Sequence, residues 1–132
     1  MSTLKMFEVV GVSDIVSELN AFAQQRAAEG VLVHVTSISV VPSRNDRFFV
    51  SFSYDEEENK EGAFYAELLV DNSAEALCQT FETEMERLTE QGFKITITTQ
   101  AGIFYGNCDS YTRYGVIAVG KIEDHTLEAK FK

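Results

Sequence analysis

Histidine, the side chain most often used for proton transfer near neutral pH, is scarce in this sequence. Of the two present, His34 lies among valines in a predicted strand and His125 lies in a predicted turn. The sequence also lacks the G-x-S-x-G motif of hydrolases, the phosphate-binding G-x-x-x-x-G-K-S/T motif and the dinucleotide-binding G-x-G-x-x-G motif. We therefore predict no catalytic residues, no cofactor and no enzymatic activity.

Cysteine is equally scarce. Cys78 falls on the apolar side of a predicted helix and Cys108 in a predicted loop, which favours two free thiols in a reducing compartment over a disulfide bond. As a nucleophile Cys108 would need a base within reach, and only His125 is available. Since no histidines and cysteines have metal-ligand spacing, no metal site is predicted.

Basic residues are outnumbered, with 11 lysines and arginines against 21 acidic residues and a formal net charge of −10. Such a field repels nucleic acid and anionic membranes and speeds encounter with a basic partner, although it also serves solubility. No apolar run approaches the roughly 18 residues of a membrane-spanning helix, and the first residues do not resemble a signal peptide. We expect a cytoplasmic protein without direct contact to nucleic acid or membrane.

What the chain does contain is a pattern that occurs twice. An extended segment, an amphipathic helix ending in glycine and two further extended segments run from residue 4 to 56, and the same order returns from 64 to 123. Ser13 is the predicted cap of the first helix, and Asn72 or Ser73 that of the second. The helices are predicted to end at Gly30 and Gly92.

The extended segments are rich in β-branched and aromatic residues. They are predicted at 4–10, 31–41, 48–55, 64–70, 94–103, 113–122 and 126–131. The first segment is mostly apolar, which favours a central place in the sheet, and residues 55–62 form a charged connector between the units.

These elements predict an α+β fold in a single domain spanning residues 1–132. The two β-α-β-β units would form one largely antiparallel sheet of six or seven strands, with both helices packed on one face. The open face would carry aromatic residues such as Phe49 and Tyr65, which a homodimer or a higher homo-oligomer would cover.

Residues 102–115 form the segment that most resembles a binding site, because they contain three glycines and three of the five tyrosines. The candidate ligand- or partner-binding residues are Tyr105, Asn107, Asp109, Tyr111, Arg113 and Tyr114. Alternatively, the segment is a β-hairpin whose tyrosines only cover the edge of the sheet. A second candidate surface is the acidic row of Glu82, Glu86 and Glu90, which is predicted to face solvent from the second helix.

Three hypotheses for the function follow. The first is a non-enzymatic protein that binds a basic protein partner stoichiometrically, as inhibitors, immunity proteins and phage anti-defence proteins do. The second is a binder of a small ligand, sequestering a nucleotide signal, with tyrosines stacked on the base and Arg113 holding phosphate. The third is an enzyme whose site is assembled from residues distant in sequence.

Overall fold

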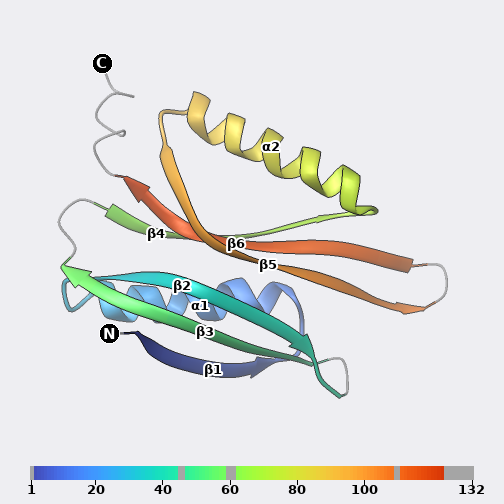
Figure 1. Ribbon diagram of the computed structural model, residues 1–132, viewed down its shortest axis with the longest axis horizontal. Helices are drawn as coiled ribbons and strands as arrows, with labels where there is room; N and C mark the ends of the chain where they lie inside the picture. Colours follow the sequence, from blue (N-terminus) through green and yellow to red (C-terminus); the bar gives the residue numbers. More distant parts are fainter. Residues whose placement is uncertain (1, 45–46, 59–61, 109–110, 124–132) are drawn as a thin grey trace.

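The order β-α-β-β occurs twice in the structure, as the sequence pattern predicts (Figure 1). The structure is a computed structural model that describes residues 2–44, 47–58, 62–108 and 111–123. The elements are β1 (Thr3–Val9), α1 (Ser13–Ala27), β2 (Val31–Pro42), β3 (Phe48–Glu58), β4 (Gly62–Asp71), α2 (Ala74–Glu90), β5 (Lys94–Cys108) and β6 (Tyr111–Glu123). The strand predicted at 126–131 lies outside the described residues.

The strands form two antiparallel sheets of three, in the orders β1-β3-β2 and β4-β6-β5. The α+β class is therefore confirmed, but the expectation of one continuous sheet was wrong. The sheets meet where β2 lies beside β5, and each of these strands carries a bulge there, between Val35 and Ser37 and between Ile97 and Thr99. Because a bulge bends its strand and interrupts regular pairing, β2 and β5 touch without forming a ladder.

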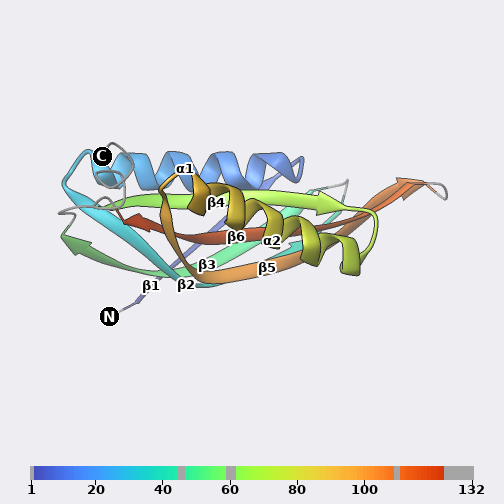
Figure 2. The same ribbon diagram turned by 90° about the horizontal axis from the view of Figure 1, so that it is seen from above.

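The two helices lie on opposite faces of the second sheet, which corrects the prediction that they share one face (Figure 1; Figure 2 gives the view from above). Side chains alternate along β4: Phe64, Ala66 and Leu68 point into the core that contains α1, while Tyr65 and Glu67 point toward α2. The underside of the second sheet therefore covers α1, and α2 covers its upper side.

Among the described residues, elements cover only one face of the first sheet. Its inner face supplies Val50 and Phe52 to the core, whereas Leu4, Met6 and Phe49 are 57%, 52% and 38% exposed on the outer face. β1 lies at the edge of this sheet, so the central place expected for it was wrong. Phe49 lies on the open face as expected, and Tyr65 does not, because it is buried beneath α2.

The helix ends agree with the sequence in all but one position. Gly30 and Gly92 follow the helices with φ of 80° and 92°, a region that glycine enters without steric cost. Ser73 caps α2 by accepting a hydrogen bond from the Ala76 amide at 3.1 Å. Ser13 does not cap α1: it is the first residue of the helix, and the preceding residue makes no side-chain cap.

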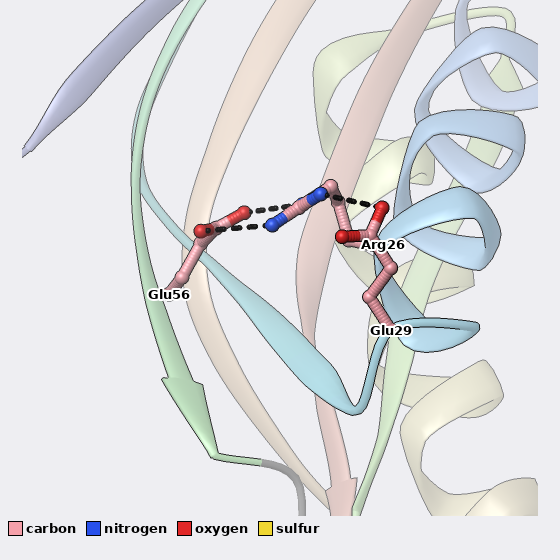
Figure 3. A network of polar contacts seen from close by, with 3 residues as sticks. All are labelled: Arg26, Glu29 and Glu56. Carbon is pink, nitrogen blue, oxygen red and sulfur yellow. Dashed lines mark hydrogen bonds and ion pairs between the residues drawn. The ribbon is translucent and has the colours of Figure 1, made fainter.

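An arginine ties the end of α1 to β3. The Arg26 guanidinium donates to the Glu56 carboxylate at 2.5 Å and to Glu29 at 3.0 Å (Figure 3). Both carboxylates raise the pKa of Arg26, the hydrogen bond to Glu56 most strongly. Because the three side chains are partly exposed, this cluster fixes orientation more than it adds stability.

Candidate functional site

A groove runs between α2 and the β5–β6 hairpin. Its larger part has a volume of about 830 Å³ and is lined mainly by apolar side chains. The helix contributes Ala74, Leu77, Cys78, Phe81 and Glu82, and the hairpin contributes Gln100, Gly102, Ile103, Phe104, Tyr114, Gly115 and Val116. A second hollow of about 530 Å³ continues from Phe81 to Met85, Ile95 and Ile97. We call the two together the α2 groove.

Part of the groove wall carries no side chain. Gly102 of β5 lines the groove, and a Cβ added at this position would meet no atom within 4 Å. The apolar stripe of α2 therefore remains half-buried, and none of the described residues of this helix is fully buried.

Two aromatic rings stand at one end of the groove. Phe104 of β5 and Tyr114 of β6 are paired across the hairpin, with ring centroids 5.1 Å apart and an interplanar angle of 60°. This edge-to-face arrangement is a favourable one for aromatic rings. Phe104 is 60% exposed, so the pair offers apolar surface to whatever enters the groove.

Polar contacts attach α2 to β4 on the side away from the groove. Tyr65 donates a hydrogen bond to Glu67 at 2.5 Å, and burial together with this bond raises the pKa of Tyr65. Burial also raises the pKa of Glu67, and the neighbouring Glu84 carboxylate adds to the rise. Arg87 pairs with Glu84 at 2.7 Å and thereby lowers the pKa of Glu84. None of these four side chains is among the residues lining the groove, so we interpret the cluster as a structural tie.

A second tie holds the start of the helix. Thr80 donates to the Asp71 carboxylate at 2.7 Å, and the Asn72 amide donates to the same carboxylate at 2.7 Å. These hydrogen bonds, that from Thr80 first, lower the pKa of Asp71. The start of α2 is thus fixed over the end of β4, which sets the width of the groove at this end.

The acidic row of the sequence lies along the exposed side of α2. Glu82, Glu86 and Glu90 are all exposed, and they are spaced four residues apart, so they follow one another along the helix. Glu82 also lines the groove. Cys78, one turn before Glu82, is an exposed free thiol on the same border.

Within the segment 102–115, the described residues belong to the paired strands β5, up to Cys108, and β6, from Tyr111. Of the predicted binding residues, Tyr114 lines the groove, while the guanidinium of the adjacent Arg113 donates to Asn72 at 3.4 Å. Tyr111 has only its backbone described, as do Tyr105 and Asn107, and Asp109 lies outside the described residues. A binding role for these residues stays a prediction.

The groove itself was missed by the sequence analysis. Its signal was present in Phe81 and Met85, which occupy the apolar stripe of α2, and in Gly102 of the facing strand β5. A wide apolar stripe on a helix that faces a strand position without a side chain leaves space between the two. Recognising this would have required the register between α2 and the sheet, which the pattern alone does not provide.

The fold and the groove define an α+β protein with antiparallel sheets and a candidate binding surface on its second helix. Comparisons of the chain with protein-family models, curated proteins and solved structures found no match. Among the described residues there is no group of three or more histidine, cysteine or acidic side chains placed to hold a metal ion. Within the same residues, no helix has the length and apolar character needed to span a membrane.

Proposed function

We propose that the protein is a non-enzymatic, stoichiometric binder of a basic protein partner, in the manner of an acidic inhibitor, an immunity protein or a phage anti-defence protein. The observation that carries this proposal is the exposed row of Glu82, Glu86 and Glu90 beside an apolar groove, in a chain of net charge −10. We place the interaction in the cytoplasm, where the exposed thiol of Cys78 stays reduced.

The row and the groove contribute in different ways. Exposed ion pairs add at most about 1 kcal/mol each, so the carboxylates mainly speed encounter and select partners of opposite charge. The half-buried Leu77, Phe81 and Met85 supply apolar surface for the affinity. Lysine and arginine fit both features, because their aliphatic stems cover apolar surface while their charged ends reach carboxylates.

Charge reversal tests the proposal. The immobilised chain should capture a basic protein at low salt, and the double variant Glu82→Lys/Glu86→Lys should lose at least about tenfold in affinity for it by calorimetry. The matched control, Glu18→Lys/Glu58→Lys, makes the same change in net charge on exposed residues away from α2 and should bind nearly as the wild type. Capture that is indifferent to salt and to reversal of the α2 row contradicts the proposal.

A second candidate, a small aromatic ligand such as a nucleotide, is favoured by the Phe104–Tyr114 pair at the end of the groove. A base would stack on these rings. The test is a thermal-shift screen with nucleotides: a ligand at about 100 times its Kd stabilises by about 2.7 kcal/mol, and Tyr114→Ala should abolish the shift. Phe49→Ala, on the open face of the first sheet, is the control that should retain it. The absence of a shift with every nucleotide counts against this candidate.

A further inference from the structure

The two β-α-β-β units correspond residue by residue. The helix-ending glycines, Gly30 and Gly92, are 62 residues apart, and the bulges of β2 and β5 occur at the same offset. For β3 and β6 the offset is 66 residues, since Val35 pairs with Tyr54 and Ile97 pairs with Gly120. β1 and β4 keep the offset of 62, since Val9 pairs with Phe48 and Asp71 pairs with Tyr114. Residues 3–42 thus correspond to 65–104, and residues 48–57 correspond to 114–123.

Inside the protein, the second sheet covers the seam between α1 and β2. Five apolar residues along this seam are at most 5% exposed: Ile15, Leu19, Ala23, Val33 and Val35. Their counterparts along the seam between α2 and β5 line the α2 groove and are only half-buried: Leu77, Phe81, Met85, Ile95 and Ile97. The groove is therefore the surface of the second unit that corresponds to the covered surface of the first.

The covering surface also has an exposed counterpart. The second sheet packs on the first unit through residues that include Ala66, Leu68 and Ile103. Their counterparts in the first sheet are Leu4, Met6 and Val41, which are 57%, 52% and 49% exposed. Together with Phe49, which is 38% exposed and pairs with Val41, these residues form what we call the open face.

A hydrogen bond at the junction of the two sheets follows the same correspondence between the units. Where the sheets meet, the Thr98 hydroxyl is 3.2 Å from the Val119 carbonyl of its own sheet and donates at 2.7 Å to the Val35 carbonyl of the other unit. Its counterpart Thr36 donates to the Ser53 carbonyl at 3.2 Å and is exposed. A partner surface equivalent to β2 would offer Thr36 a second acceptor, and the residue that corresponds to Val35 is Ile97 of the groove.

We propose that a second copy of this chain docks its open face into the α2 groove, repeating between molecules the contact that joins the two units within one. Thr36 of the second copy then reaches the Ile97 carbonyl of the first. Because the two contacting surfaces differ, each copy keeps one of each, and the contact builds a ring or an open chain of molecules in place of a symmetric dimer.

Charge repulsion opposes this association and makes it depend on salt. Asn20 and Gln24 of α1 border β4 within the protein. Their counterparts in α2 are Glu82 and Glu86. These carboxylates would stand at the rim of the contact between two chains that each carry −10. Added salt screens the repulsion, so association between copies strengthens with salt, whereas binding of a basic partner to the acidic row weakens.

Sedimentation velocity of the full chain tests the proposal, from about 10 µM to about 1 mM protein and at about 0.05 M and about 0.5 M NaCl. The average mass should rise with concentration, beyond that of a dimer, and more so at the higher salt. Met6→Glu, at an exposed position of the open face, should leave a monomer. Val10→Glu is the matched control: Val10 is 57% exposed against 52% for Met6, but its counterpart Asn72 lies outside the core, so association should persist.

A mixing experiment distinguishes this contact from a symmetric one. Phe81→Glu and Met85→Glu each place a carboxylate in the apolar groove. Their unfolding temperatures identify a variant that remains folded. Either variant should be monomeric alone, yet should form a one-to-one heterodimer with Met6→Glu, which keeps an intact groove.

These measurements contain no basic partner, so they test association between copies independently of the proposed function. A monomer under all conditions overturns the proposal, as does a dimer that resists groove variants. A chain of residues 1–123 that associates where the full chain does not would assign the groove to the chain's own last residues, and would overturn it equally.

Discussion

At the scale of single residues, the half-buried Glu67 carries a pKa raised by burial and by the Glu84 carboxylate. The folded state therefore binds this proton more readily than the unfolded state, and the carboxylate opposes folding above its ordinary pKa. As pH falls from 7, protonation of Glu67 relieves this cost, until the ordinary carboxyl pKa of about 4.3 is reached and the unfolded state is protonated as well.

Glu67→Gln removes this pH dependence. The amide oxygen still accepts from Tyr65 and the amide nitrogen donates to Glu84, as the protonated carboxyl does. We expect the variant to be at least as stable as the wild type at pH 7 and to lose that advantage at pH 5, measured as the free energy of unfolding in urea. Glu82→Gln, on the exposed side of α2, serves as the control. Parallel pH profiles for wild type and Glu67→Gln would contradict the assignment.

Gly120 is a second residue with a definite expectation. A Cβ at this position would collide with the Thr96 carbonyl oxygen, because the bulge of β5 brings its backbone against β6. Gly120→Ala should therefore destabilise the protein by about 3 kcal/mol or more, at the upper end of overpacking effects. Gly102→Ala is the control, since its Cβ would meet no atom within 4 Å. Equal unfolding midpoints for the two variants would refute the close approach.

At the scale of elements, the two helices have the same place in their units but different surroundings. Leu19 of α1 is 1% exposed, whereas its counterpart Phe81 of α2 is half-buried. Leu19→Ala should cost about 2–5 kcal/mol of unfolding free energy. Phe81→Ala should cost less than half of that value, although it removes more atoms. Chemical denaturation of the two variants measures the difference, and losses of equal size would show that α2 is packed as tightly as α1.

The sequence predicted some of these elements and not others. Apolar periodicity and glycine placement predicted both helices and the doubled order, because these depend on neighbours along the chain. The split into two sheets depends on the bulges at Val35/Ser37 and Ile97/Thr99, which leave no mark in composition. That split determines what packs on each face of the second sheet. The burial of Tyr65 and the groove beside Phe81 follow from it and could therefore not be predicted from the sequence.

At the scale of the whole molecule, the two units contribute side chains to one core. The underside of the second sheet supplies Ile117 and Val119, both fully buried, to the core that contains Ile15 and Leu19 of α1. Separate chains of residues 1–60 and 61–132 should each fail to fold, and mixing them should recover native circular dichroism. Cooperative unfolding of either chain alone would show that a single unit holds its own core.

The position of β6 has a consequence for motion. This strand is bonded on both edges, by β4 and β5, and Ile117, Ala118 and Val119 are shielded above and below. The β6 amides become exposed to solvent only when the elements on both edges and both faces of the strand separate. They should therefore exchange with deuterium only as fast as the entire molecule unfolds. The β1 amides, at an exposed rim, should exchange orders of magnitude sooner, which would make the N-terminal strand the part of the protein first released to solvent.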